Sequence, residues 1–271
     1  MDTPDAAVGR AGPDVFAKIC HLAGQAVTEY RMTRPGDRIL VGLSGGKDSM
    51  VLMHVLTRLC RNAPFLFHVR SVFVDMGFPN QNAGAVETYC RDQGWEHETI
   101  HFPGAELMKE KKAENRPCRL CSRLRRGQLH RAANRLGCSK IALGHNLDDI
   151  CVSFLLPLFR GGGLTTMGPH VPADAGTKAI IRPLCFVTRQ LIEAAADGLD
   201  FPVAEKCPYQ NQLEERGDRA YLQRLLDRLG EKFPHVRSAM LTSLRDVRPA
   251  YLLDRKFLNL DGTPDNTRQE Q

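Results

Sequence analysis

Residues 44–49 have the sequence SGGKDS, and all six positions suit the binding of a phosphate chain. The two adjacent glycines let the backbone approach an anion with no Cβ in the way, and the lysine adds a positive charge. The serines at both ends offer hydroxyl groups. The candidate phosphate-binding residues are therefore Ser44, Gly45, Gly46, Lys47, Asp48 and Ser49.

The segments on either side of this turn predict how it is positioned. A short apolar run at 38–43 is typical of a buried strand, and apolar residues at helical spacing in 50–61 predict an amphipathic helix. A strand, a glycine turn and a helix bring free N–H groups and the positive end of the helix dipole to one spot. The alternative is an ordinary tight turn. The spacing of the ordinary P-loop is not met, because that motif has four residues between its first glycine and its G-K-[ST] ending.

Paired acids, Asp148 and Asp149, follow a strand predicted at 140–143 and the turn residue Gly144, and they precede an apolar helix predicted at 150–159. Carboxylates at such a turn can hold a divalent cation against phosphates, or they can cap the helix. We expect one acid to cap and the other to act in the site.

A second informative stretch, residues 116–137, contains a C-x-x-C pair, Cys118 and Cys121, and seven arginines between positions 116 and 135. Apolar residues at helical spacing predict a helix with one buried face, which leaves the arginines mostly on the other. A basic face without acidic residues suits a phosphodiester backbone, whereas an ordinary solvated helix usually mixes both charges. The candidate RNA-binding residues are Arg123, Arg125, Arg126 and Arg131.

The nine cysteines divide into two groups. Six of them, at 20, 60, 90, 138, 151 and 185, lie in apolar segments and are predicted to be small buried hydrophobic residues. Cys207 lies in a polar loop before a proline. A lone C-x-x-C pair fits half a zinc site, a redox dithiol or chance. With Cys207 it would supply three thiolates, which leave one iron of a [4Fe–4S] cluster open.

Strands and helices alternate along the chain, which predicts an α/β protein with a doubly wound, mostly parallel sheet. Further strands are predicted at 65–75, 96–102 and 179–184, a helix at 83–92, another from Thr188, and a charged connector at 105–115. Asp75 ends its strand at the edge where open α/β sheets bind ligands. The predicted divisions are a mobile tail at 1–13, an N-terminal helix at 14–36, a catalytic domain at 37–210, a helical region at 211–260 and a frayed tail at 261–271.

The composition, with 42% hydrophobic and 25% charged residues, is that of an ordinary globular protein, and no apolar run is long enough to span a membrane. An odd number of cysteines without a secretory leader favours reduced thiols or metal ligands. We therefore expect a cytoplasmic protein without a membrane partner. The net charge of +6 is compatible with an acidic partner.

SGGKDS resembles the PP-loop of the ATP pyrophosphatases, which cleave ATP between the α and β phosphates and transfer AMP to a substrate oxygen. Together with PCRLCSRLRRG, GHNLDD, FRGG, IRPL and RPAYLLDRKF, it makes the chain similar, after residue 14, to the tRNA 2-thiocytidine synthetase family, TtcA. The family's better-known members read GHHRDD at the position of GHNLDD, a form that this chain shares with tRNA 2-thiouridine enzymes.

The resemblance implies a Rossmann-like PP-loop fold with helical additions at both ends, ATP and Mg²⁺ as requirements, and a [4Fe–4S] cluster held by Cys118, Cys121 and Cys207. Lys47, Asp48 and Asp149 become the catalytic residues. Asp48 or Asp149 would help to hold Mg²⁺, Asp75 would meet the adenosine half, and Gly144 joins the nucleotide-binding set. The family also implies tRNA as a partner, a sulfur donor such as a cysteine desulfurase, and a homodimer.

The expected function is ATP-dependent conversion of cytidine 32 in the anticodon loop of tRNA to 2-thiocytidine. Adenylation turns the poor leaving group O2 into a phosphate that leaves easily, and sulfur then replaces it. The alternatives are a tRNA 2-thiouridine synthetase, another PP-loop enzyme without iron such as a lysidine synthetase or an amide-forming ligase, and a non-catalytic nucleotide and iron–sulfur sensor that binds RNA.

Overall fold

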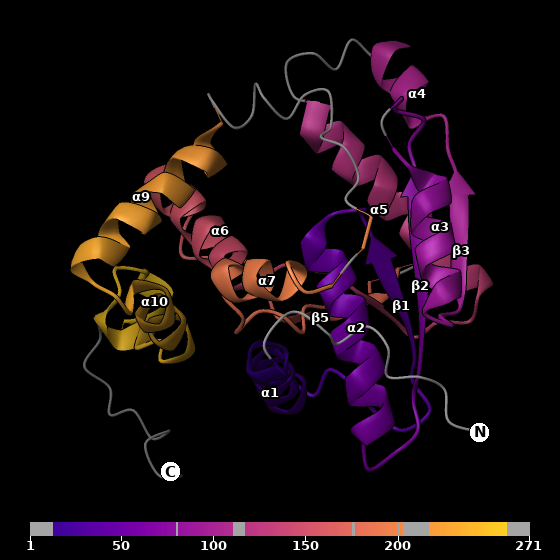
Figure 1. The fold of residues 1–271 in the computed structure, drawn as a ribbon. Helices are drawn as coiled ribbons and strands as arrows, with labels where there is room; N and C mark the ends of the chain where they lie inside the picture. Colours follow the sequence, from indigo (N-terminus) through magenta and orange to yellow (C-terminus); the bar gives the residue numbers. More distant parts are fainter. Residues whose placement is uncertain are drawn as a thin grey trace.

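The computed structural model describes residues 13–79, 81–110, 117–174, 177–199, 201–202 and 217–258. Its six-stranded sheet has the order β3-β2-β1-β4-β6-β5, and Figure 1 labels β1, β2, β3 and β5. The strands are β1 (Arg38–Leu43), β2 (His68–Asp75), β3 (His97–His101), β4 (Lys140–Ala142), β5 (His170–Val171) and β6 (Ala179–Ile181). All neighbours pair in parallel except β5, which runs antiparallel to β6. The predicted doubly wound, mostly parallel α/β sheet is confirmed.

Among the described residues, helices connect the successive parallel strands β1 to β4, and others precede β1, follow β4 and follow β6. They are α1 (Pro13–Glu29), α2 (Lys47–Asn62), α3 (Ala83–Asp92), α4 (Gly104–Glu110), α5 (Pro117–Arg135), α6 (Leu147–Phe159), α7 (Arg189–Ala196), α9 (Asp218–Lys232) and α10 (Val236–Arg245). Two short 3-10 helices, Pro249–Tyr251 and Arg255–Phe257, come last. Within the described ranges, no helix has both the length and the apolar character that a membrane span requires.

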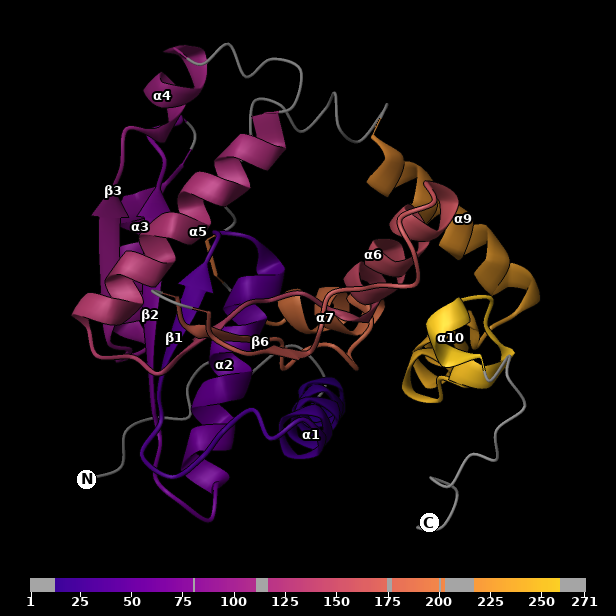
Figure 2. The same cartoon turned by 180° about the vertical axis from the view of Figure 1, so that it is seen from behind.

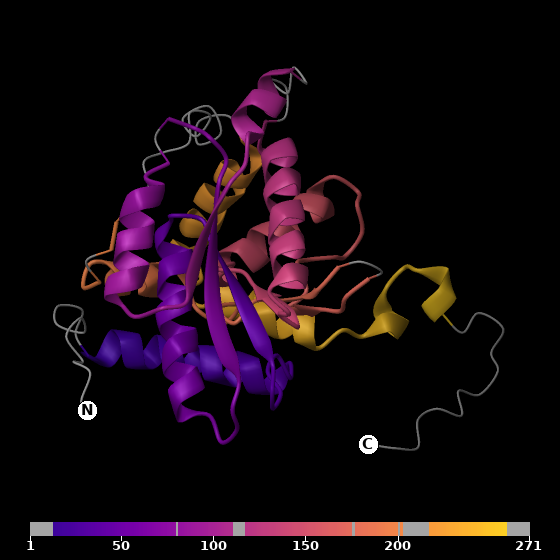
Figure 3. The ribbon, with the colours of Figure 1, turned by 90° about the vertical axis from the view of Figure 1, so that its right-hand side faces the viewer.

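Helices cover both faces of the sheet because the side chains of β1 alternate between two cores. Ile39 and Val41 pack with residues of α1, α2 and α7 in one cluster, while Leu40 packs with residues of α5 in another. Figures 2 and 3 show α5 on the face of the sheet opposite to α1 and α2. A Cβ on Gly42 would come within 2.9 Å of Leu129, so this glycine lets α5 lie close to β1.

The chain reverses direction across the sheet at β1. It passes outward through β2 and β3, and then returns to place β4 on the other side of β1. In open α/β sheets, ligands bind outside the carboxyl ends of the strands at such a switch point. The SGGKDS segment spans the turn after β1 and the start of α2, and the paired acids lie in the first turn of α6, after the turn that follows β4, so the sheet brings both predicted sites to one edge.

The C-terminal helices form a third layer with α6. Leu222 and Leu226 of α9 are buried against Leu147, Cys151 and other residues of α6. Figure 1 shows α6, α9 and α10 grouped on the side of the molecule away from β2 and β3. The helical region predicted after residue 211 therefore contains α9 and α10, and the predicted division at 210 and 211 lies outside the described residues.

Several predicted boundaries are wrong. α2 begins at Lys47 and α6 at Leu147, so the polar residues assigned to preceding turns are first-turn helical residues. Residues 105–110 of the predicted connector at 105–115 belong to α4, in which Glu106, Lys109 and Glu110 are exposed and Met108 is buried, and the rest of the connector lies outside the described residues. β5 was not predicted, since two residues carry too little pattern. Of the six apolar cysteines, five are buried and Cys60 is half-buried.

The core predicts a sharp contrast between two leucines. Leu56 of α2 is fully buried and Leu66 is 82% exposed. Replacing Leu56 by Ala leaves a cavity and should lower the free energy of unfolding by about 2–5 kcal/mol. Leu66→Ala should change it by no more than about 0.5 kcal/mol. Urea unfolding of both variants tests this, and equal losses would contradict the packing described above.

Candidate active site

The SGGKDS segment forms a loop whose shape is held by its own serines. The Ser49 hydroxyl donates to the Gly46 carbonyl at 2.9 Å and accepts from the Ser44 N–H at 3.0 Å. Gly45 has a φ of 80°, a conformation that glycine adopts without strain. Gly46 is the N-cap of α2 and has no side chain to satisfy the first N–H groups of the helix. An anion suits this position, because it would accept from those groups at the positive end of the helix dipole.

Lys47, the predicted catalytic lysine, pairs with Glu193 of α7. The Nζ–Oε1 distance is 3.1 Å, and both side chains are nearly half exposed. Such a solvated pair contributes about 0–1 kcal/mol, so little energy opposes movement of the lysine toward a phosphate.

The turn between β4 and α6 lies directly against the start of α2. A Cβ on Gly144 would come within 3.0 Å of the backbone of Asp48 and of the Ser49 nitrogen, so the contact requires glycine. Asn146 caps α6, accepting from the Asp149 N–H at 3.1 Å, and the Asp149 carboxylate accepts from the Asn146 N–H at 3.1 Å. The amide of Asn146 also donates to Asp48 at 2.9 Å. This residue therefore joins the two helix N-termini.

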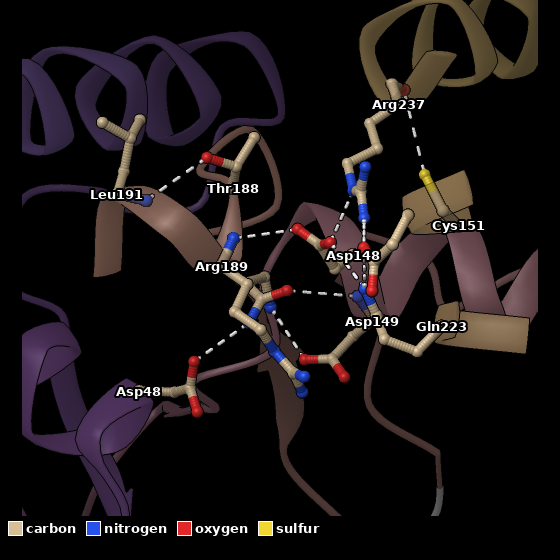
Figure 4. A network of polar contacts seen from close by, with 11 residues as sticks. Asp48, Asp148, Asp149, Cys151, Thr188, Arg189, Leu191, Gln223 and Arg237 are labelled. Atoms are coloured by element: carbon tan, nitrogen blue, oxygen red, sulfur yellow. Dashed lines mark hydrogen bonds and ion pairs between the residues drawn. The ribbon is translucent and has the colours of Figure 1, made fainter. Parts of the chain in front are cut away.

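The neighbouring acids have different surroundings (Figure 4). Asp148 is buried, and its carboxylate accepts from the Arg189 N–H at 2.8 Å and from the Gln223 amide at 3.0 Å. It also forms an ion pair with Arg237 of α10. Burial favours the protonated form, but these hydrogen bonds and the guanidinium outweigh it and lower the pKa of Asp148. Asp148 therefore holds α7, α9 and α10 together.

Asp149 borders the candidate pocket and faces Asp48 across the capping interaction. Burial raises the pKa of both carboxyl groups, and the charge of Asp149 adds to the effect on Asp48. Asp48 and Asp149 are thus two half-buried carboxylates beside the N-terminus of α2, and the charge of Asp149 disfavours the ionised form of Asp48; such a donor set suits a hard divalent cation. Asp149 both completes the capping box of α6 and lines the pocket, whereas Asp148 does neither, so the expected division into one capping acid and one site acid is wrong.

A cavity of about 290 Å³ unites the predicted elements. Its walls come from the end of β1, the start of α2, the turn after β4, β6 and one side of α5. Ser44, Asp48, Ser49, Gly144 and Asp149 all line it. The pocket is the place where a nucleotide and a second substrate could meet.

The four arginines predicted to bind RNA divide into two pairs. Arg125 and Arg126 line the pocket. The Nε of Arg125 is buried and has no hydrogen-bond partner among the described residues, so it suits an anionic ligand. Arg123 and Arg131 are exposed on α5 outside the pocket lining. The basic helix therefore reaches from the pocket to the open surface.

Cys118 and Cys121 lie at the start of α5, where the former is exposed and the latter half-buried. Their spacing of three residues places both on one side of the helix, and Ser122, beside Cys121, lines the pocket. In the ranges that the structure describes, no three His, Cys, Asp or Glu side chains form a metal site. Cys207, the predicted third thiolate, lies outside those ranges.

Asp75 ends β2 at the predicted edge but is engaged locally. Its carboxylate accepts from the Gly77 N–H at 2.9 Å and lies 3.0 Å from Nδ1 of His101. It is not among the residues that line the pocket. Contact with an adenosine stays a prediction for this residue.

Comparison with known proteins agrees with this geometry. The PP-loop domain family matches residues 19–207. The tRNA-cytidine(32) 2-sulfurtransferase of Syntrophotalea carbinolica is 38% identical over 89% of this chain and 93% of its own length. The protein of the same name from Geobacter sulfurreducens is 37% identical over 92% of this chain and 97% of its own. The chain belongs to this family of PP-loop proteins.

A solved structure supports the fold. The U34-tRNA thiolase NcsA from Methanococcus maripaludis, determined with its [4Fe–4S] cluster, has a TM-score of 0.72. It covers 96% of this chain and 86% of its own, with 20% sequence identity. The predicted Rossmann-like PP-loop fold is therefore confirmed. The family model and the curated relatives confirm the predicted family.

Sequence reasoning missed three residues that shape the site of this family member. Asn146 precedes Asp149 by three positions, the spacing of a capping box, and that signal could have identified it as the cap. His145 lines the pocket, and Arg182 donates from Nε to its Nδ1 at 3.3 Å. No local pattern relates these two, because they come from different strands.

The close contact at Gly144 leads to a test with two glycines. Gly144→Ala places a methyl group against the α2 backbone. It should weaken ATP binding at least tenfold, because the SGGKDS loop and the turn that carries Asp149 must move apart. A Cβ on Gly127 of α5 would meet nothing within 4 Å, so Gly127→Ala should leave binding unchanged. Calorimetric titration with ATP and Mg²⁺ measures both. Unchanged affinity in Gly144→Ala would place the nucleotide elsewhere.

Proposed function

We propose that this chain is an ATP-dependent tRNA-cytidine(32) 2-sulfurtransferase. The observation that carries the proposal is the pocket, in which the SGGKDS loop, Asp149 and the cysteine-bearing helix α5 converge. Identity above 35% over nine-tenths of the chain to relatives of that name supports it.

The chain's own residues divide the work of adenylation. The N-terminus of α2 and Gly45–Gly46 bind the pyrophosphate portion of ATP, and Lys47 leaves Glu193 to neutralise it. Asp48 and Asp149 would hold Mg²⁺, which supplies further charge neutralisation at the phosphates. The cytosine O2 then attacks the α-phosphorus, an O2–P bond forms, and the bond from that phosphorus to pyrophosphate breaks. Electrostatic stabilisation by preorganised groups is the main contribution of such a site.

Sulfur replaces oxygen in the second half of the reaction. A [4Fe–4S] cluster held by Cys118, Cys121 and Cys207 would supply an open iron site for the incoming sulfur. Sulfur adds to C2, the C2–O2 bond breaks, and AMP leaves with that oxygen. The place of Cys118 and Cys121 on the pocket helix supports this arrangement, because a flipped base in the pocket would lie near both centres.

Binding of tRNA follows from the charge of α5. Arg125 and Arg126 are proposed to contact the phosphates beside the target base, and Arg123 and Arg131 to contact the backbone farther along. We further propose a cysteine desulfurase or another sulfur donor as a partner, a homodimer, and action in the cytoplasm, where tRNA is the abundant substrate.

Nucleoside analysis tests the function directly. Mass spectrometry of tRNA from cells that lack this protein should show loss of 2-thiocytidine while 2-thiouridines persist. The wild-type gene should restore the modification, and Asp149→Asn should not. Loss of 2-thiouridine instead would assign the uridine branch. Unchanged thionucleosides would exclude both and favour an iron-free ligase or a sensor.

Cluster binding predicts a contrast among the cysteines. Anaerobically purified protein should be brown, with about four irons per chain, the content of one such cluster. Cys118→Ser, Cys121→Ser and Cys207→Ser should each lose the colour. Cys138→Ser is the control, because Cys138 is buried in the core beneath α5. Stoichiometric zinc without visible absorbance would contradict the assignment, as would a complete cluster in Cys118→Ser.

A further inference from the structure

His145 lines the pocket and is held from one side by a buried arginine. It follows Gly144 in the turn after β4, and Arg182, directly after β6, donates from Nε to its Nδ1 at 3.3 Å. Arg182 is only 6% exposed, and its Nη1 donates to the Gly168 carbonyl. The arginine is thus fixed at two points, and it fixes the imidazole ring.

This contact determines the tautomer of the ring. A guanidinium has only N–H donors and stays protonated in proteins, so the nitrogen that it contacts must accept. Nδ1 of His145 therefore carries a lone pair, and in the neutral ring the proton lies on Nε2. Nε2–H is therefore the one donor of the side chain, and Arg182, which has no acceptor, cannot bind to it.

The surroundings also favour the neutral ring. Burial, the largest cause, and the charges of Arg182, Arg219 and Arg126 together lower the pKa of His145 to about 4. These arginines come from the strand end, from α9 and from α5, so positive charge faces the ring from three elements. Among the described residues, the charges that act on the ring are all cationic. His145 is accordingly uncharged near neutral pH.

We propose that His145 is a hydrogen-bond donor of the adenylation step, giving Nε2–H to a phosphoryl oxygen at the α position of ATP, and that Arg182 is its positioning residue. The proposal rests on the proposed function. Gly144, its neighbour, touches the backbone at the start of α2, where the β and γ phosphates are expected, so the α-phosphoryl group belongs on the pocket side of that contact. A donor aimed where negative charge develops stabilises the transition state.

Two substitutions separate a donor from a merely polar residue. The amide of Gln can occupy the place of Nε2, whereas the shorter Asn reaches only the place of Nδ1. His145→Asn should slow tRNA-dependent release of pyrophosphate about 100-fold, the usual effect of losing one such donor. His145→Gln should stay within about tenfold of the wild type. Equal rates in both variants, with equal thermal stability, would overturn the proposal.

His54 supplies a matched control. It is also held neutral, since burial lowers its pKa to about 4, but it lies in an aromatic cluster with Tyr89 and Trp95. It is not among the residues that line the pocket. His54→Gln should change the thermal midpoint and leave the rate of pyrophosphate release unchanged. A rate loss equal to that of His145→Asn would mean that the assay reports only folding.

Nitrogen NMR measures the tautomer of His145 directly and needs no enzymatic activity. In ¹⁵N-histidine-labelled protein, the resonances absent from His145→Gln should show protonated Nε2 and unprotonated Nδ1, unchanged from pH 8 to 5.5. Arg182→Met should mix the tautomers and raise the pKa, and Arg182→Lys should restore part of the wild-type pattern. Protonated Nδ1 in the wild type would contradict the proposal for His145 and leave the proposed function intact. If the wild-type protein releases no pyrophosphate from ATP in the presence of tRNA, the proposed function itself is contradicted.

Discussion

The hydrogen bond from Asn146 to Asp48 joins the two helix N-termini on which the site depends. One helix starts at the loop that suits pyrophosphate, and the other starts at the acid that suits the cation. Asn146 also caps its own helix through a reciprocal pair with Asp149. Loss of this residue would free both helix starts at once. The close packing of Gly144 on the α2 backbone makes the same junction rigid.

Asp148 and Asp149 have different contacts because adjacent residues of a helix point in different directions. Asp148 ties the helix to α7, α9 and α10, and Asp149 stays at the pocket. The C-terminal layer is thereby coupled to the active-site turn. Arg219, from that layer, acts electrostatically on both His145 and Asp149. Packing of α9 and α10 therefore affects the charge balance of a site built mainly by the sheet.

The proposed function would use both the cysteines and the arginines of α5. α5 packs against β1 over Gly42 and extends past the edge of the sheet that holds the phosphate loop. Cys118 and Cys121 lie near its start, and Arg125 lines the pocket one to two turns later. A helix placed in this way can present a base to the nucleotide and to sulfur from a single rigid element. The proposed order of adenylation followed by sulfur transfer needs that proximity.

The sequence by itself determined the parts whose signal is local. The apolar run and the amphipathic pattern on either side of the glycine loop predicted β1 and α2, because backbone conformation and periodicity depend on near neighbours; phosphate binding at the loop stays a prediction. The alternation of strands and helices likewise predicted the parallel sheet. The same reasoning could not tell Asp148 from Asp149, since adjacent residues in a first helical turn differ only in what packs against each.

Tertiary structure decided which distant residues meet. The strand order places the turn after β4 beside the turn after β1, and only then do Asn146 and Asp48 contact each other. His145 and Arg182 follow the neighbouring strands β4 and β6, which are joined by a long connection. No sequence spacing therefore predicts that they pair. Polar contacts of this kind are specified by packing around them, whereas the helix and strand signals lie within each segment. Local sequence signals thus predicted the SGGKDS loop, whereas the fold alone decided which charged groups surround it.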